Sequence, residues 1–319
     1  MNIKNEFPLV SIGMPTYNGG KKIPRALSSI LAQNYPSLDI IISDNCSTDN
    51  TAEVVMNAQK RNPEIKYYRQ AKNIGVLPNF EFCIDRAKGK YFMWVSDDDT
   101  LEPGALLRYV EFLEANPEYS LVSGYIKYWK EDTLDYIERD LSFERNSPFL
   151  RTIQYYFAVV YGGMFHGLMR SEMAKRVPIR KAFANDFHFV ANLAFLGRIR
   201  NLEQTGYNKY LGGFSKDLKQ CAITLGESNL ASEFPFVKVA IDSFKEILFR
   251  SPVYKDVPLL IRLPFAAAGF CSSFLSFYGK VYPFILGGRV KRFVYKIFGI
   301  PDKGSIIKKR TLSVSENRT

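Results

Sequence analysis

The stretch YFMWVSDDDTLEPGAL, residues 91–106, joins a short apolar segment to three consecutive aspartates and the beginning of a helical pattern. The apolar residues 91–95 are typical of a buried β-strand, and a helix is expected from Gly104 to Ala115. Adjacent carboxylates raise one another's pKa unless a cation or hydrogen-bond donors balance their charge. The triplet is therefore either a solvated turn that caps the next helix or a loop that binds a cation.

The rest of the first 125 residues repeats the same strand-then-helix unit. Strands are predicted at residues 9–14, 39–43, 65–69, 91–95 and 119–125, and helices at residues 23–31, 51–60, 79–87 and 104–115. Such alternation predicts an α/β fold, with a doubly wound, mostly parallel, Rossmann-like sheet. Ligands of such sheets bind at the carboxyl ends of the strands.

Unusual polar residues follow each of the first four strands. We take these as candidate substrate-binding or metal-binding residues: Pro15, Thr16, Tyr17 and Asn18; Asp44 and Asn45; Asn73 and Gly75; and Asp97, Asp98 and Asp99. Because the carboxyl ends of parallel strands share one edge, four loops should converge there, which favours a ligand site over a solvated turn. No glycine-rich phosphate loop follows the first strand, so a bound nucleotide would need another counter-charge, such as a divalent cation on Asp98 and its neighbours.

Two stretches, VSIGMPTYNGGKKIPRALSSILAQNYPSLDIIISDNCSTDNT (10–51) and GKYFMWVSDDDTLEPGALLRYVEFLEANP (89–117), carry a resemblance to a known family. Together with NIGV (73–76) they resemble the inverting glycosyltransferases of family 2, which have the GT-A fold. The resemblance covers residues 8–125 closely and residues 160–215 more loosely. It implies transfer of a sugar from a nucleotide diphosphate to an acceptor hydroxyl, with Mn²⁺ or Mg²⁺.

The resemblance also implies roles for the strand-end residues. Pro15, Tyr17 and Asn18 match family positions that line the nucleotide pocket, and Asp44-Asn45 stands where the family often has two aspartates that recognise the base. In the metal motif, Ser96 stands where the first aspartate often lies. Asp98 then matches the metal ligand, with Asp97 nearer the ribose and Asp99 supporting. Oxygen ligands of this kind suit Mg²⁺ or Mn²⁺ rather than zinc.

The second half supplies a candidate general base. Asn185-Asp186, at the start of a predicted helix, matches a family motif that usually reads Glu-Asp, so Asp186 is the candidate catalytic residue. The alternative is that Asp186 is only a carboxylate that the helix dipole favours. His188 is a candidate metal or diphosphate contact or else a structural histidine. His166, within GGMFHGLMRS (162–171), lies in a segment that in the family underlies the acceptor site, and its role stays open.

The charge and the cysteine content indicate the cellular compartment and the partners that the protein can have. The net charge is +11, and from Lys280 onward ten basic and two acidic residues give +8. Four scattered cysteines without a C-x-x-C pair predict a reduced, cytoplasmic protein, and no secretory signal is predicted at the start. No nucleic-acid-binding motif is recognisable, so the basic tail does not predict a nucleic-acid partner.

The basic tail instead predicts contact with an anionic membrane surface. Residues 263–279 are uncharged, but they fall short of the ~20 residues that span a bilayer, and Pro264 and Gly269 interrupt them. Residues 281–300 interleave aromatic and basic residues, as an interfacial amphipathic helix would. The alternative is an ordinary helix packed on the catalytic domain.

These observations predict three segments and one function with an alternative. Residues 1–128 would bind the nucleotide sugar, residues 129–225 would complete the GT-A domain on the acceptor side, and residues 226–319 would form a helical, basic extension. The predicted function is metal-dependent sugar transfer to a glycan or lipid-linked acceptor, in bacterial cell-surface polysaccharide or glycolipid synthesis at the inner face of the cytoplasmic membrane. The alternative is a nucleotidyltransferase acting on sugar phosphates.

Overall fold

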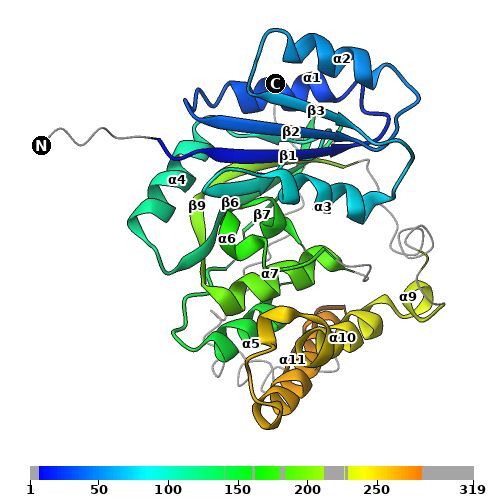
Figure 1. Cartoon of the computed structure of the whole chain (residues 1–319). Coiled ribbons are helices and arrows are strands. Elements are labelled where there is room, and N and C mark those ends of the chain that lie inside the picture. The colour runs from blue at the N-terminus through cyan, green and yellow to red at the C-terminus, as the bar shows by residue number, and fades with distance from the viewer. Residues whose placement is uncertain are drawn as a thin grey trace, which may run out of the picture.

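The computed structural model describes residues 7–139, 141–159, 162–179, 184–211, 226 and 229–281, which form one mixed sheet with helices on both of its faces (Figure 1). The strands are β1 (Val10–Thr16), β2 (Leu38–Asp44), β3 (Ile65–Arg69), β4 (Tyr91–Trp94), β5 (Thr100–Leu101), β6 (Tyr119–Lys130), β7 (Thr133–Glu138), β8 (Leu168–Arg170) and β9 (Arg198–Tyr210). The sheet order in this described part is β3-β2-β1-β4-β8-β6-β9-β5, and β7 pairs with β6.

The helices divide between the two ends of the chain. The first group is α1 (Ile23–Leu31), α2 (Thr51–Gln59), α3 (Val76–Arg86) and α4 (Ala105–Ala115). The second group is α5 (Pro148–Ala158), η1 (Gly163–His166), α6 (Ser171–Ala174), α7 (Asn185–Leu196), α9 (Asn229–Glu233), α10 (Pro235–Lys245), η3 (Glu246–Arg250), η4 (Pro252–Tyr254) and α11 (Leu259–Val281). Figure 1 shows α5, α10 and α11 at the end of the molecule opposite to α1 and α2.

The first four strands and helices form as the sequence predicts. β1 pairs in parallel with both β2 and β4, and β2 pairs in parallel with β3. The arrows of β1 and β2 point the same way in Figure 1. Their carboxyl ends, and the polar loops that follow them, therefore lie at one edge of the sheet.

Alternation along the strands explains why helices cover both faces. Ile40 and Ile42 of β2 share a core cluster with Ile30 of α1, whereas Ile41 joins Cys83 of α3 in the cluster on the other face. Successive side chains of a strand point to opposite faces of the sheet, so an apolar strand without polar positions must be covered by helices on both faces. Burial of each aliphatic side chain contributes about 1.5–3 kcal/mol to this packing.

The second half of the sheet is less regular than the sequence predicts. β8 lies between β4 and β6 and is antiparallel to both, while β9 is parallel to β6. The mostly parallel arrangement thus holds for β3-β2-β1-β4 and for the β6-β9 pair, and β8 joins these two parallel groups. β6 extends to Lys130, so the predicted segment boundary at residue 128 falls inside a strand.

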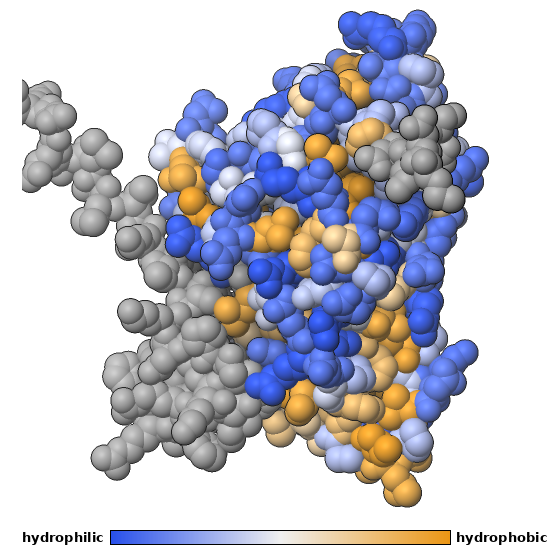
Figure 2. All heavy atoms as spheres, turned by 90° about the vertical axis from the view of Figure 1, so that its left-hand side faces the viewer, coloured by the Kyte–Doolittle hydropathy of each residue, from blue (hydrophilic) through white to orange (hydrophobic). Residues whose placement is uncertain are grey.

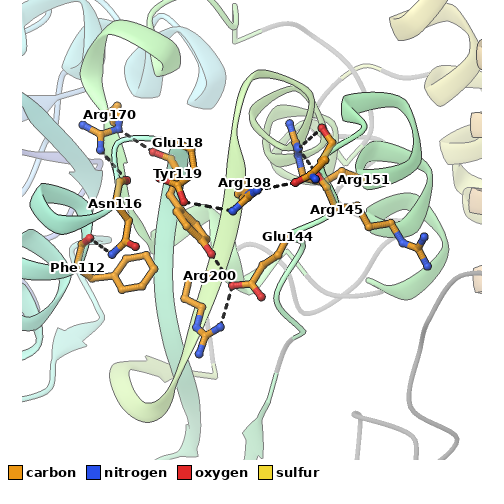
Figure 3. Close-up of polar contacts among 11 residues, drawn as sticks. Phe112, Asn116, Glu118, Tyr119, Glu144, Arg145, Arg151, Arg170, Arg198 and Arg200 are labelled. Atoms are coloured by element: carbon orange, nitrogen blue, oxygen red, sulfur yellow. Dashed lines mark hydrogen bonds and ion pairs between the residues drawn. The ribbon is translucent and has the colours of Figure 1, made fainter.

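A network of arginines connects β6, β8 and β9 at the edge of the sheet where β6 and β9 begin and β8 ends (Figure 3). The Arg170 guanidinium donates to the carbonyl of Tyr119 (2.7 Å), and the Tyr119 hydroxyl donates to Glu144 (2.7 Å). Glu144 also pairs with Arg200 at 2.8 Å. Part of the chain's positive charge is therefore matched by protein acceptors at this edge.

The C-terminal helix α11 corrects one expectation. It is 23 residues long and continues through Pro264 and Gly269, so the predicted interruption is wrong. A Cβ on Gly269 would lie 2.6 Å from Ile247 Cδ1, so the glycine allows close helix packing rather than a break. Residues 259–276 are long and apolar enough to cross a membrane by length and composition, a test that a core helix of a soluble protein can also pass. The predicted interfacial segment 281–300 lies almost wholly outside the described residues.

Candidate active site

The loops after β1 and β2 hold each other in place. The backbone N–H of Asn18 donates to Ser47 Oγ (2.8 Å), and the Asn18 side-chain oxygen accepts from the N–H of Thr48 (2.9 Å). Asn18 and Cys46 both have left-handed backbones, with φ of 52° and 65°. Non-glycine residues in this conformation concentrate at functional sites. Pro15 and Thr16 are buried at the end of β1, whereas the Tyr17 ring is half exposed beside the loops.

Asp44 and Asn45 reach the predicted edge, but their side-chain atoms bind protein groups. Asp44 is fully buried and accepts hydrogen bonds from the N–H of Ser47 (2.8 Å) and the hydroxyl of Tyr67 (2.6 Å). Asn45 donates to Asn73 Oδ1 (3.0 Å), and its own oxygen accepts from the N–H of Ile74 (2.8 Å). In this arrangement both residues shape the loops, and each of their side-chain oxygens already accepts one hydrogen bond from the protein.

Asn73 and Gly75 belong to the loop that Asn45 fixes. The Asn45 amide also donates to the Gly75 carbonyl (3.2 Å), and the N–H of Gly75 donates to Asn73 Oδ1 (2.9 Å). Gly75 has φ of 90°, which a residue with a side chain rarely adopts. The loop after β3 is thereby joined to the loop after β2.

The three aspartates after β4 face three different environments. Asp97 accepts a hydrogen bond from the Thr16 hydroxyl (2.5 Å), and burial raises the pKa of its carboxyl. Asp98 is partly exposed, with Lys22 Nζ 3.5 Å from its carboxylate and Arg25 donating to its carbonyl (2.7 Å). The charge of the triplet is thus shared between donors and cations from β1 and α1.

Asp99 points the other way, toward β9. One of its oxygens accepts from the hydroxyl of Tyr207 (3.1 Å) and the other from the N–H of Tyr210 (2.9 Å). Burial raises the pKa of Asp99 to about 6. Both oxygens thus have a protein partner from β9, which favours a supporting structural contact, and the prediction that Asp99 joins Asp98 as a metal ligand stays a prediction.

Asp186 lies at the N-terminus of α7, against a pair of glycines. One of its carboxylate oxygens accepts from the N–H of Phe187 (2.9 Å). A Cβ on Gly162 would lie 2.1 Å from the other oxygen, so only glycine leaves room for this carboxylate. A half-buried carboxylate of this kind can act as a proton acceptor.

Glu138, at the end of β7, is a second carboxylate beside the same glycines. A Cβ on Gly163 would lie 2.7 Å from Glu138 Oε2, which also accepts from the Tyr128 hydroxyl (2.6 Å). Its Oε1 atom has no hydrogen-bond partner among the described residues. Burial raises the pKa of Glu138, and the negative charge of Asp186 adds to this effect. Glu138 was not predicted from the sequence, because an acidic residue in a strand with exposed polar positions is usually solvated.

Lys209, on β9, was also missed, and its charge reaches several of these groups. Burial raises the pKa values of Asp99 and Glu138, and the positive charge of Lys209 partly offsets this rise. The same charge adds to the effect of burial that lowers the pKa of His166. This shared electrostatic influence connects the acidic loop after β4 with the carboxylates beside the glycine pair. The signal in the sequence was a lysine at the end of a long amphipathic strand, which does not by itself indicate a site.

His166 lies behind the acidic loop. Its Nδ1 atom is 3.3 Å from the Trp94 carbonyl, and its ring stacks on Tyr207 with 4.7 Å between centroids. Burial lowers the pKa of His166 to about 3, so the ring is neutral. The Tyr207 hydroxyl donates to Asp99 in the acidic loop. By stacking on the Tyr207 ring, His166 therefore helps to hold this loop in place.

His188 does not join the site. It follows Asp186 by two residues on α7, and the ~200° turn between them sends its ring to the opposite side of the helix. There it is buried beside Tyr156, and neither ring nitrogen has a hydrogen-bond partner among the described residues. This position favours the structural alternative, and a contact of His188 with substrate or metal stays a prediction.

A family model described as glycosyl transferase family 2 matches residues 11–177, more than half of the chain. The chain belongs to glycosyl transferase family 2. The resemblance in the sequence is thereby confirmed, and the protein is a glycosyltransferase. The nucleotidyltransferase alternative is set aside, because family membership assigns the chain to sugar transfer.

Two bacterial relatives illustrate the range of the family. The chain is 28% identical to the GalNAc(5)-diNAcBac-PP-undecaprenol beta-1,3-glucosyltransferase of Campylobacter jejuni, over 70% of each protein. It is also 28% identical to the hyaluronan synthase of Pasteurella multocida, over 69% of this chain but only 22% of the synthase. The chain thus spans about a fifth of the larger enzyme.

Solved structures confirm the GT-A fold. TarS 1–349 of S. aureus matches with a TM-score of 0.59 and 18% identity, over 91% of this chain and 78% of that one. The mannosyltransferase PcManGT of Pyrobaculum calidifontis, in complex with GDP-Man and Mn²⁺, matches with a TM-score of 0.53 and 16% identity, over 92% and 85%. At these identities the likeness concerns the fold.

The donor atoms of the acidic loop are compatible with a divalent cation such as Mg²⁺. No three His, Cys, Asp or Glu side chains form a complete metal-binding set within the described residues. Mg²⁺ is commonly held by one or two carboxylates together with substrate phosphates, so a complete protein set is not required. Asp98 is the least engaged carboxylate of the triplet and Asp97 is its neighbour, so this pair fits such a site.

Proposed function

We propose that this family 2 glycosyltransferase moves a sugar from a nucleoside-diphosphate sugar to an acceptor hydroxyl, with inversion and with a divalent cation. The observation that carries the proposal is that Asp98 is left partly free at the strand edge, while a second carboxylate, Asp186, lies against Gly162. Solved structures of similar fold bind UDP, UDP-GlcNAc, and GDP-Man with Mn²⁺, which supports a donor of this class.

Residues of the first four strands would bind the donor. Asp98, with Asp97, would hold Mg²⁺ or Mn²⁺, which when bound neutralises charge that develops on the departing diphosphate. The exposed Tyr17 ring is available to stack on a base, beside the loop that Asn18 rigidifies. Asn45 holds the loop after β3 against the loop after β2, through the hydrogen bond that its side-chain oxygen accepts from Ile74.

Asp186 would act as the general base. As the acceptor oxygen forms its bond to the anomeric carbon, the bond from that carbon to the diphosphate oxygen breaks, and the hydroxyl proton passes to the Asp186 carboxylate. General-base assistance of this kind contributes typically ~10²–10⁴-fold in rate. Attack from the side opposite to the leaving group gives inversion.

The acceptor is proposed to be a glycan or a lipid-linked glycan in bacterial surface polysaccharide or glycolipid synthesis. The activities for which the Campylobacter and Pasteurella relatives are named support this class. Residues 1–128 would bind the donor, residues 129–225 would complete the acceptor side, and residues 226–319 would act at the cytoplasmic face of a membrane.

The test is incubation with a panel of nucleotide sugars, with and without EDTA, while nucleoside diphosphate release is measured. Asp98→Ala should abolish turnover and retain the fold, since loss of one charge relieves repulsion within the triplet. Asp186→Asn should lower kcat by ~10²-fold or more with little change in nucleotide affinity. Asp132→Ala, in an exposed turn, is the matched control.

Two outcomes would contradict the proposal. Full activity of Asp98→Ala in EDTA would remove the cation from the mechanism. Equal losses of nucleotide binding and turnover in Asp186→Asn would show that Asp186 contacts the donor rather than accepting the proton.

A further inference from the structure

One side of α11 presents apolar residues to solvent. Leu260 is 90% exposed and Leu263 is 51% exposed. Ala267 and Cys271 continue the exposed stripe at intervals of about one turn. In Figure 2 apolar atoms gather at the lower end of the molecule, where Figure 1 places α10 and α11. A stripe of this length is larger than the scattered apolar residues of an ordinary surface.

The neighbouring helix extends this apolar surface. A shallow hollow of about 330 Å³ lies between α10 and α11, and its lining is apolar throughout: Ile241, Phe244, Ala267, Phe270 and Cys271. Phe249, at the end of η3 directly after α10, is 75% exposed. We call the surface formed by these residues with Leu260 and Leu263 the α10–α11 face.

The opposite side of α11 is packed on the protein. The Ser273 hydroxyl is hydrogen-bonded to that of Ser243 on α10 (2.8 Å), and the Ser276 hydroxyl donates to the carbonyl of Val159 (3.4 Å). The Phe265 ring contacts that of Phe149 on α5, with 5.0 Å between centroids. Beyond its exposed first turn, a helix held in this way offers only one side to a lipid phase. Therefore α11 can lie along a membrane surface but cannot cross the bilayer without leaving α5 and α10.

The charges around the face favour an anionic surface. Lys245 and Lys255 are exposed and Arg262 is partly exposed, with Asp256 the exposed acidic residue between them. The nearby Asp242 is fully buried and paired with Lys238 and Arg250. From Lys280 the sequence adds a net charge of +8. Each basic residue near an anionic membrane can contribute ~1 kcal/mol.

We propose that the α10–α11 face docks on a bilayer that contains anionic lipid, with α11 parallel to the membrane plane. Phe249, Leu260 and Leu263 enter the interfacial layer, and the hollow between the helices receives acyl-chain segments. The inference does not depend on which sugar is transferred. If the acceptor is lipid-linked, the same docking brings the candidate active site to its substrate.

Vesicle flotation of the full chain tests the docking. We expect binding to phosphatidylcholine vesicles with 30% phosphatidylglycerol and weaker binding without the anionic lipid. The double variant Leu260→Ser/Leu263→Ser should lower the partition coefficient about tenfold or more, because it removes two apolar side chains that would leave water on docking. The matched control is Met56→Ser/Leu107→Ser, which removes two half-exposed apolar side chains from α2 and α4. Circular dichroism melting establishes that both variants fold.

Depth measurements distinguish the in-plane helix from a spanning one. In a background without the native cysteines, single cysteines at positions 260, 267 and 271 carry a fluorophore that spin-labelled lipids quench. Similar depths at all three positions support docking parallel to the surface. A graded depth from 260 to 271 would overturn it in favour of a spanning helix.

Two further results would also overturn the proposal. The first is vesicle binding that the leucine variant leaves unchanged. The second is a dimer, seen by light scattering without lipid, that the leucine variant dissociates, because a second copy of the chain would then be the occupant of the face.

Discussion

Within the acidic loop, neighbouring residues of one type have separate tasks that depend on the direction of each side chain. Asp97 is hydrogen-bonded to β1, Asp98 is left partly free, and Asp99 is bound to β9. Side-chain direction also separates Asp186 from His188, which are two residues apart on α7 and lie on opposite sides of that helix. Asp98 and Asp186 are left the freest to take part in the proposed chemistry, and Asp97 can assist Asp98 from the position that Thr16 gives it.

Gly162→Ala tests whether the position of Asp186 matters. The added Cβ would lie 2.1 Å from the Asp186 carboxylate, which must therefore rotate away. We expect kcat to fall ~10-fold or more with donor KM nearly unchanged, because the base loses the geometry that proton transfer requires. Steady-state kinetics and a thermal melt measure both effects. Unchanged kcat in a folded variant would contradict the role of Asp186.

Glu138→Gln tests the buried carboxylate beside Gly163. The folded-state pKa of Glu138 is raised above its ordinary value of 4.5, so its ionisation destabilises the fold as pH rises through that window. Gln keeps an acceptor for the Tyr128 hydroxyl and cannot ionise. We expect a higher free energy of unfolding than wild type at pH 8 and little difference at pH 4. We also expect lower kcat, because carboxylates with perturbed pKa values concentrate at functional sites.

Glu144→Gln is the matched control, because it should change the free energy of unfolding at pH 8 in the opposite direction. Arg200 and Tyr119 hold the pKa of Glu144 below its ordinary value, although burial opposes them. Its ionised form therefore stabilises the fold above the unfolded-state pKa, and Gln should lower stability at pH 8. Urea unfolding of both variants at the two pH values measures the contrast. A loss of stability in Glu138→Gln at pH 8 would contradict the argument.

At the scale of elements, local patterns determined how much the sequence could predict. The first four strands and helices were predictable because each has a clear apolar period and a polar boundary. β8 was not, because three residues carry no period and its place between β4 and β6 depends on pairing distant in sequence. The roles of Asp99 and Glu138 were equally hidden, since the direction of a side chain follows from β7 and β9, whose partners the sequence does not name.

The loop after β3 gives a prediction at this scale. Asn45 joins it to the loop after β2 through three hydrogen bonds, to Asn73, Ile74 and Gly75. Asn45→Ala removes all three, so we expect faster amide hydrogen exchange at residues 73–75 and a raised donor KM with kcat less affected. Asn57→Ala, on the surface of α2, is the control. Unchanged exchange in Asn45→Ala would show that the loop is held by other contacts.

The molecule as a whole depends on keeping two histidines neutral. His166 lies under the acidic loop and His188 lies between α7 and the C-terminal helices, and these are the only histidines in the chain. Burial lowers their pKa values to about 3 and about 4. Near His188, Asp242 favours the charged ring, whereas Arg250 and Lys238 oppose it.

Acid should therefore loosen the whole fold, and His188→Phe should reduce that sensitivity. An unfolded histidine protonates near pH 6.5, but the folded rings stay neutral, so the unfolded state binds more protons as pH falls from about 6.5 toward 4. Each histidine then lowers the free energy of unfolding by up to ~1.4 kcal/mol per pH unit in that window. Buried carboxylates such as Glu138 act in the opposite direction, so the difference between wild type and variant isolates the histidine. Urea midpoints at pH 7, 6 and 5 should fall less steeply for His188→Phe, which gives up no hydrogen bond to the described residues. Parallel pH dependences for the two proteins would show that His188 accepts its proton without unfolding the helices around it.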